Sequence, residues 1–326
     1  MNKFISFCIG CMVVLLTWLM ISGCNNTHSS KTLSMALVVG IQNSPSNALV
    51  IIADDKNLFD TTKVKVQIKE FSAGKLALQA LLGAAGDLDM AVSAETPVVL
   101  SSLGGNQVNV ISQVVNASNE CRIVVRRDGN LNTPETYFSK KRIITTSQGG
   151  SPEWLTYNFL KKYNLTQREV EINAMAPENM PIALANKAVD GVSIFDPYAR
   201  LAEKELGDAA LTFLNEDMKS YYILSVKGKT LTEKKEAIIA FIDGLKKAES
   251  FVKKNTSEAQ QIIARRTKLD IDIIKTTWSN YEFRVGIDEA LIKTCQQEAH
   301  WAIETGKYPK STPIPDFSKI LTSEYV

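Results

Sequence analysis

The sequence predicts an α/β protein with mostly parallel sheets flanked by helices and a helical C-terminal part. Two observations support this class. Short apolar segments alternate with segments of helical period through the middle of the chain, and residues 232–305 then follow an almost continuous helical pattern. Strands that alternate with helices of this length form βαβ units and parallel sheets. The 326 residues are enough for two domains, or for two lobes of one chain.

The expected strands are short. Val64, Val66 and Ile68 alternate with polar residues, and this period of two is typical of a half-buried strand. Other apolar runs predict strands at residues 35–39, 89–93, 108–115, 123–125, 143–146 and 192–195. Helices are expected between them at residues 47–56, 76–82, 97–103, 154–163 and 180–187.

In the last third of the chain, apolar residues recur on one face of the predicted helices. Ile238, Phe241 and Leu245 show the spacing of three and four residues that predicts an amphipathic helix. Prolines between residues 309 and 315 then indicate an extended tail, because proline cannot continue a helix.

The first 23 residues have the layout of an export signal. Lys3 supplies a positive start, and the uncharged apolar run that follows is too short for a comfortable membrane-spanning helix of about 20 residues. Small residues then precede Cys24, which is the order of a bacterial lipoprotein signal that is cut before an acylated cysteine. We therefore expect a lipoprotein signal peptide at 1–23 and a polar tether at 24–32. Cys24 would carry a lipid such as palmitate.

This N-terminal pattern also sets the expected location. A lipid on Cys24 would hold the protein outside the cytoplasm, on the periplasmic side or the outer surface of a cell membrane. An ordinary secretory signal or an N-terminal anchor helix is the alternative interpretation of the same residues. The residues after Cys24 do not distinguish the inner from the outer membrane.

Charge and composition argue against several classes of function. Lys and Arg total 37 against 35 Asp and Glu, so the near-neutral chain has no electrostatic footprint for nucleic acid. Cys121 and Cys295 are expected to be free and buried. His300 lies on a polar helical face, and the sequence has no pair of ligands with zinc spacing. We expect no metal site, no catalytic residues and no enzymatic activity.

A small motif recurs at four expected strand-to-helix junctions, where Ser, Thr or Asp precedes proline. A short side chain at the N-cap and proline at the first helical position would suit a helix start. Ligands of open α/β sheets bind at the carboxyl ends of strands, so the four turns are candidates to face one crevice. Such caps also occur with a purely structural role. The motifs are Ser44-Pro45, Thr96-Pro97, Ser151-Pro152 and Asp196-Pro197.

The third of these turns is the most open to a ligand. Gly149 and Gly150 precede Ser151, and glycines let a ligand approach the backbone at a helix N-terminus, which favours anions and polar groups. The turn lacks the lysine and the spacing of a Walker loop, and the chain has no G-x-G-x-x-G. We therefore expect no nucleotide or other cofactor.

Four stretches of the chain carry a resemblance to a known family. They are Ala48 to Ala53 with Asn57-Leu58-Phe59, Asp87 to Val92 with Glu95-Thr96-Pro97, Lys141-Arg142-Ile143 through Gly149-Gly150-Ser151, and Val189-Asp190-Gly191 through Phe195-Asp196-Pro197-Tyr198-Ala199. Across residues 33–250 the chain resembles the solute-binding proteins of ABC importers. The family in question is the nitrate/sulfonate/taurine family, which includes binders of thiamine-pyrimidine precursors.

The resemblance implies a two-lobe, periplasmic-binding-protein-like fold of type II with the ligand between the lobes. Lobe 1 would hold residues 33–117 and 227–326, and lobe 2 residues 118–226 with the hinge crossings. The family pattern places Ser44, Ser93, Thr96, Gly150, Ser151, Phe195 and Asp196 in the cleft. Physical reasoning adds Gln42, Asn43, Glu95, Gly149 and Trp154, although for Trp154 a position in the core is the favoured interpretation.

The residues at the turns bear on the ligand. Glu95, Glu153 and Asp196 crowd the expected site, and no Arg or Lys occurs at the four turns. This balance favours a neutral, zwitterionic or amine-bearing ligand over a bare anion. The family pattern has Trp where this chain has Phe195, so stacking is retained without an indole N–H.

By resemblance, the chain would bind a small polar molecule and deliver it, as a monomer, to an ABC permease. The ligand would be a sulfonate or taurine-like molecule, a nitrate-like anion, or an aminopyrimidine-type thiamine precursor. A ligand-binding lipoprotein that serves a sensor or another surface partner is an alternative. An enzyme of the same fold, like the pyrimidine synthases, is the other. That chemistry needs histidines and a lysine-bound cofactor, and His300 alone lies in the folded part.

Overall fold

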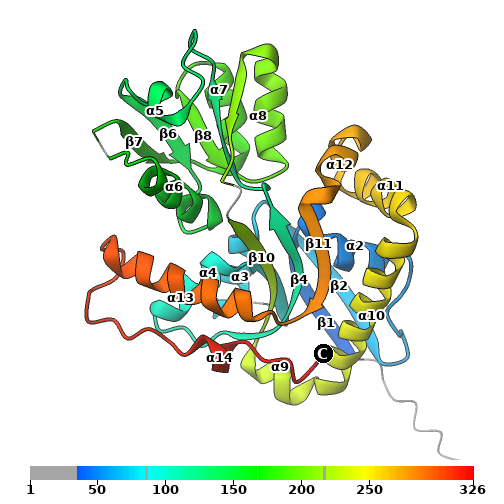
Figure 1. The fold of residues 1–326 in the computed structure, drawn as a ribbon. Helices are drawn as coiled ribbons and strands as arrows, with labels where there is room; N and C mark the ends of the chain where they lie inside the picture. The colour runs from blue at the N-terminus through cyan, green and yellow to red at the C-terminus, as the bar shows by residue number, and fades with distance from the viewer. Residues whose placement is uncertain (1–34, 85–86, 167, 216–217) are drawn as a thin grey trace, which may run out of the picture. The chain divides into compact units, whose positions relative to one another are not determined.

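The computed structural model describes residues 35–326 except 85–86, 167 and 216–217. These residues belong to one compact unit that starts at Ser34. The expected signal peptide, Cys24 and the tether lie outside the described residues. Within the described part, the chain forms a six-stranded and a five-stranded sheet, here called the first and the second sheet (Figure 1).

The first sheet combines parallel and antiparallel pairs in the order β11-β4-β10-β3-β1-β2. β1 is parallel to β2 and β3, whereas β10 runs antiparallel to β3 and β4, and β11 antiparallel to β4. The strands are β1 (Met35–Gln42), β2 (Val64–Phe71), β3 (Met90–Ala94), β4 (Asn109–Ser118), β10 (Lys219–Val226) and β11 (Tyr281–Gly286).

Helices cover both faces of the first sheet (Figure 1). One face packs against η1 (Pro45–Asn47), α2 (Ala48–Asp55), α10 (Lys235–Lys254), α11 (Thr256–Thr267), α12 (Ile271–Thr277) and η4 (Trp278–Asn280). The other packs against α3 (Gly74–Leu82), α4 (Glu95–Leu103), α13 (Glu289–Glu304) and α14 (Phe317–Ile320). α9 (Gly228–Glu233) follows β10. The apolar face expected around Phe241 and Leu245 is fully buried against α2 and the sheet.

The second sheet has the order β7-β6-β8-β5-β9. β6 is parallel to β7 and β8, and β5 is antiparallel to β8 and β9. Its strands are β5 (Arg122–Arg126), β6 (Arg142–Thr146), β7 (Val170–Ala174), β8 (Gly191–Ile194) and β9 (Ala210–Phe213). Its helices are α5 (Pro134–Tyr137), α6 (Ser151–Lys162), η2 (Pro177–Asn179), α7 (Met180–Ala185), α8 (Tyr198–Leu206) and η3 (Gly207–Ala209).

A cluster of aromatic rings fills the core of the second sheet. Phe138 contacts Phe159 and Phe213 with ring centroids 6.1 Å apart in both pairs. Because Phe159 lies on α6, this packing fixes the helix, and with it the turn that precedes it, against the sheet.

The predicted α/β class is confirmed, with two corrections. Among the described strands, five of the nine pairings are antiparallel, because the chain leaves the first sheet after β4 and returns beside it as β10. The sheets are therefore mixed, not mostly parallel. In addition, the expected helical stretch at 232–305 contains β11, where Tyr281 and Phe283 alternate with Glu282 and Arg284. No described helix is both long and apolar enough to cross a membrane.

Candidate ligand-binding site

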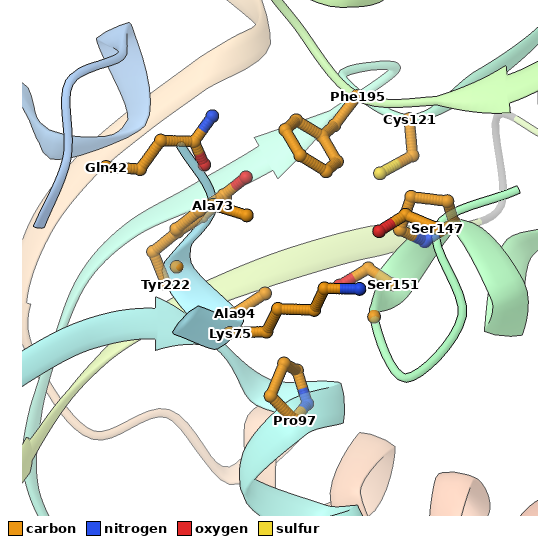
Figure 2. Close-up of a pocket in the computed structure, with 13 residues that line it drawn as sticks. Gln42, Ala73, Lys75, Ala94, Pro97, Cys121, Ser147, Ser151, Phe195 and Tyr222 are labelled. Carbon is orange, nitrogen blue, oxygen red and sulfur yellow. The ribbon is translucent and has the colours of Figure 1, made fainter. Parts of the chain in front are cut away.

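A small cavity lies where strand ends of the first sheet face strand ends of the second (Figure 2). Its volume is about 30 Å³, which holds about two water molecules. The first sheet and its helices contribute Gln42, Ala73, Gly74, Lys75, Ala94, Pro97 and Tyr222. The second contributes Cys121, Ser147, Gly150, Ser151, Pro152 and Phe195. Of the predicted residues, the lining therefore includes Gln42, Gly150, Ser151 and Phe195.

Lys75 is the cation of this cavity, and sequence reasoning missed it. Its Nζ donates to the Gln148 carbonyl oxygen of the second sheet's β6–α6 turn at 2.8 Å. Burial lowers the pKa of Lys75, while Glu153 and Glu178 oppose that shift from a distance. The four predicted turns carry no Lys or Arg, but the cavity has a cation from a fifth turn, between β2 and α3. The β2–α3 turn was overlooked because it lacks the Ser/Thr/Asp-Pro motif.

Close backbone packing positions Lys75. Gly74 begins α3, and a Cβ added there would lie 3.0 Å from the Ser93 Cα and 3.2 Å from the Val92 carbonyl oxygen. Only glycine lets the start of α3 lie this close to β3 without a shift of the backbone. A glycine directly after a strand and before a helix is the local signal that could have indicated this turn.

Hydroxyl groups and the start of α6 form the opposite wall. Ser147 follows β6, is 1% exposed, and its Oγ has no hydrogen-bond partner in the described structure. Gly150 is the N-cap of α6 and Ser151 its first residue. Gly149 has a φ of 73°, which favours glycine, and its N–H donates to Glu153 Oε2 at 2.8 Å. The amide of Gly149 is therefore engaged in the turn itself.

The aromatic part of the lining comes from Phe195 and Tyr222. Phe195 follows β8 and meets Tyr198 edge to face, with ring centroids 5.8 Å apart. The Tyr222 hydroxyl donates a short hydrogen bond to Glu120 Oε1. Burial raises the pKa of Glu120 to about 8, against the lowering effect of this hydrogen bond. A flat or apolar ligand part would find ring surfaces here.

Several predicted residues of the β3–α4 junction lie behind the cavity wall. Ser93 is buried and its Oγ donates to the Ala94 carbonyl oxygen at 3.0 Å. Glu95 accepts the Tyr221 N–H at 2.8 Å, and burial raises the pKa of Glu95 to about 7. Thr96 Oγ1 donates to Glu298 Oε1 at 2.8 Å and lies 3.3 Å from Ser151 Oγ. At this junction the lining comes from Ala94 and Pro97 instead.

The first predicted turn also faces away from the cavity beyond Gln42. Asn43 donates through Nδ2 to Glu70 at 3.1 Å and to the Arg266 carbonyl oxygen at 3.2 Å. Ser44 is buried and shares a hydrogen bond of 2.7 Å with the Ser46 hydroxyl. Neither residue lines the cavity, because the chain turns into η1 directly after the strand.

The expected excess of negative charge at the site is not found, because two of its three carboxylates have cationic partners. Asp196 accepts from both terminal nitrogens of Arg122, at 2.5 and 3.2 Å, with both side chains 2% exposed. Glu153 pairs with Lys307 and accepts the Gly149 N–H. Burial raises the pKa of Asp196 although Arg122 opposes that shift. These carboxylates have their own cations, so they do not repel an anion as the sequence suggested.

Trp154 lies outside the cavity. Its indole packs against Trp301 of α13, with ring centroids 5.3 Å apart, and it belongs to the apolar cluster of the first sheet. Trp154 is therefore part of the core, as the favoured interpretation of the sequence had it, and it does not line this cavity.

The predicted helix caps are largely wrong. Only Ser44-Pro45 has serine at the N-cap and proline at the first position, and Ser44 makes no side-chain cap bond. Helix α6 starts at Ser151 itself, and α4 starts at Glu95, before Thr96. Pro197 is the N-cap of α8 and follows a cis Asp196–Pro197 bond. The motifs mark strand-to-helix junctions correctly, but their side chains serve other contacts.

The remaining reactive residues are placed as predicted. Cys121 and Cys295 are free and buried, and burial raises the pKa of both thiols. His300 is exposed on α13. Among the described residues, no group of three or more His, Cys, Asp and Glu side chains could hold a metal ion.

Comparison with known proteins identifies the family. Residues 31–267 match the family described as NMT1-like. The chain belongs to the NMT1-like family. This NMT1-like chain is 24% identical over 315 residues to a Bacillus subtilis (strain 168) protein provisionally named as an aliphatic sulfonates-binding protein. The alignment covers 94% of this chain and 93% of the relative.

Solved structures confirm the predicted fold of this NMT1-like protein. The alkanesulfonate-binding protein SsuA from Xanthomonas axonopodis pv. citri, bound to MOPS, superposes with a TM-score of 0.74 at 19% identity, covering 88% of this chain and 97% of that one. The periplasmic nitrate-binding protein NrtA from Synechocystis PCC 6803 gives a TM-score of 0.68 at 15% identity, covering 90% and 87%. The predicted family and the periplasmic-binding-protein-like fold are thereby confirmed.

Proposed function

We propose that this NMT1-like protein is the lipid-anchored, extracytoplasmic solute-binding component of an ABC importer. It captures a small polar molecule between two lobes, built on the first and the second sheet, and hands it to a membrane permease. Candidate ligands are sulfonate- or taurine-like molecules, nitrate-like anions, and aminopyrimidine-type thiamine precursors. The names of its relatives, which bind sulfonates or nitrate, support this range.

The observation that carries the proposal is the composition of the cavity wall. Its lining comes from both lobes, and most of it follows the carboxyl ends of strands, as is typical of ligand sites in α/β sheets. A ligand held there contacts both lobes at once. Such a ligand stabilises the closed arrangement of the lobes. The size of this effect depends on the contacts that the ligand makes with both lobes only when they are closed.

The size of the cavity bears on how a ligand enters. A volume of about 30 Å³ is far below the ~300 Å³ or more of typical small-molecule sites. In the described conformation the cavity is thus too small for a molecule of several heavy atoms. Entry of a molecule of several heavy atoms requires the lobes to part, which is the hinge motion of two-lobe binding proteins.

The chemistry of the lining supports binding without turnover. Burial raises the pKa of the Cys121 thiol, so it is not a thiolate nucleophile at neutral pH. The lining serines have no histidine among the cavity residues to act as their base. The lining suits orientation and capture of a ligand. A receptor that passes its bound state to a sensor would use the same site, and a permease partner is favoured here by the relatives' names.

Ligand-induced stabilisation tests the proposal. Purified protein is melted in the presence of taurine, alkanesulfonates, nitrate, bicarbonate, aminopyrimidines and a broad metabolite panel. A ligand at 100 times its Kd should add about 3 kcal/mol to the free energy of unfolding. The compound should be recovered unchanged by chromatography. A Phe195→Ala variant should lose most of the shift, whereas Ile182→Ala, at an exposed site on α7, should keep it. Absence of any stabilising compound, or conversion of one, would contradict the proposal.

A further inference from the structure

We propose that Lys75 recognises a full negative charge on the ligand, which it holds together with Ser147 and the start of α6. The ligand is therefore a small organic anion or a zwitterion, and its charged group sits between α3 of one lobe and α6 of the other. This inference rests on the proposed function, and it deepens that proposal by naming the ligand class and a specificity-determining residue.

The position of Lys75 is the first argument. It is the second residue of α3, directly after the glycine that packs against Ser93, so its backbone has little freedom. Figure 2 shows its side chain extending across the cavity toward Ser147 and Ser151 of the other lobe. Its Nζ reaches the Gln148 carbonyl oxygen at 2.8 Å. The ammonium group thus stands in the gap between the lobes.

The charge of Lys75 is the second argument. The structure gives this lysine no ion pair with any described carboxylate, and its hydrogen bond goes to a neutral carbonyl oxygen. The nearest acidic influences are Glu153, which is already paired with Lys307, and Glu178, which is exposed on η2. A partly buried cation without a counter-ion favours an anion beside it.

The opposite wall supplies donors for the same group. Ser147 Oγ is 99% buried, lines the cavity and has no hydrogen-bond partner within the described part of the chain. Ser151 also lines the cavity, and its Oγ lies 3.3 Å from Thr96 Oγ1, whose proton is donated to Glu298. Helix α6 has 12 residues and no side chain caps it, so its N-terminus carries a partial positive charge toward the cavity.

These groups together are suited to a tetrahedral or planar oxyanion. A cation from one lobe and hydroxyl donors from the other would converge on it, so the anion would bridge the lobes where Gln148 now accepts from Lys75. The rings of Phe195 and Tyr222 would contact the organic remainder. A charge-assisted contact of this kind should favour the anion over its neutral isostere by about 10- to 100-fold.

Charge-matched ligand pairs test the inference. Isothermal titration on the whole protein compares ethanesulfonate with ethanesulfonamide, propionate with propionamide, and taurine with its sulfonamide, beside the broad panel used for the proposed function. We expect the wild type to prefer a charged member by at least 10-fold. Lys75→Met should erase that preference, and Lys75→Arg should keep most of it. Ser147→Ala should weaken the binding of the anion several-fold. Lys254→Met, at the end of α10, is the matched control and should change nothing.

The outcomes separate the two proposals. If a neutral member or a neutral aminopyrimidine binds as tightly as any anion, the inference is overturned and the proposed function stands. The same holds if Lys75→Met keeps the charge preference while its melting curve shows a folded protein. If no compound in the whole panel binds, both the inference and the proposed function fail.

Discussion

The indole of Trp154 packs against the indole of Trp301, with ring centroids 5.3 Å apart and planes inclined by 55°. Trp154 lies on α6 beside the second sheet, and Trp301 on α13 beside the first. The contact is reinforced nearby, because Tyr157 donates to Glu304 at 3.3 Å and Lys307 pairs with Glu153. The helices α6 and α13 therefore join the two halves of the molecule beside the cavity.

This contact predicts the effect of Trp301→Ala. Trp301 is 2% exposed, so its loss should lower the free energy of unfolding by about 3–5 kcal/mol. It should also favour separation of the lobes, which urea denaturation and small-angle scattering would detect together. Tyr157→Phe keeps the ring and removes the hydrogen bond to Glu304. It should lower the free energy of unfolding by about 1 kcal/mol. A Trp301→Ala protein with unchanged stability and radius of gyration would contradict this role.

The buried pair of Arg122 and Asp196 predicts a large asymmetric effect. Asp196→Ala leaves the Arg122 guanidinium buried with Glu203 as its remaining carboxylate, and should destabilise the protein by about 3–5 kcal/mol in urea denaturation. Glu233→Ala breaks an exposed pair with Lys229 and should change stability by about 0.5 kcal/mol at most. Equal effects of the two substitutions would show that the buried pair is not structurally important.

Burial of Glu120 and Glu95 predicts that stability falls as the pH rises. Their pKa values in the folded protein, about 8 and about 7, lie above the usual value of 4.5. Between these values the folded state binds more protons than the unfolded chain, so the free energy of unfolding decreases from about pH 5 to about pH 8. The slope is about 1.4 kcal/mol per pH unit for each group.

Denaturation curves at several pH values measure this slope. Glu120→Gln mimics the protonated carboxyl and should flatten the dependence, while Glu135→Gln, at an exposed site, should leave it unchanged. A profile that is flat in the wild type, or equally steep in Glu120→Gln, would argue against a protonated Glu120.

Helix α10 contains a glycine whose replacement should destabilise the protein despite better helix propensity. A Cβ at Gly244 would lie 2.4 Å from the ring of Phe59, which is held in a stack on Phe241 with centroids 5.1 Å apart. Overpacking in Gly244→Ala should therefore lower the free energy of unfolding by about 1–3 kcal/mol. This loss should outweigh the ~1 kcal/mol by which alanine stabilises a helix relative to glycine.

The matched control is Gly228→Ala at the start of α9, where the nearest atom to the new Cβ lies 3.6 Å away, at ordinary contact distance. Its thermal midpoint should stay within a few degrees of the wild type. A stabilised Gly244→Ala protein would mean that the Phe59 ring can move aside.

Part of the candidate site follows from local sequence, and part does not. Ser151 and Phe195 line the cavity because each comes shortly after a strand, and strand ends are visible as the points where an apolar run stops. Lys75 was missed for a different reason. Its turn matters because β2 pairs in parallel with β1 and so ends at the same sheet edge, and that pairing is a long-range fact.

The charge balance of the site was misjudged for the same kind of reason. The sequence shows Asp196 at a turn, but Arg122, which neutralises it, lies 74 residues away. Likewise, Trp154 lies on a predicted helix, yet local sequence does not tell which surface its face will meet. The strand β11 is not predicted from the sequence, because its short alternation of apolar and charged residues lies between two long helical patterns.

The amino-acid sequence by itself determined the α/β class, the positions of most strands and helices, the strand-to-helix junctions, and the family. These are local properties, because periodicity and turn residues act within a few positions of the chain. Only the tertiary structure decided which junction residues face the cavity, that Lys75 is its cation, and that Asp196 and Glu153 are paired with Arg122 and Lys307. Periodicity reveals that a side chain is buried, but the group against which it is buried depends on strand order and on contacts between distant segments.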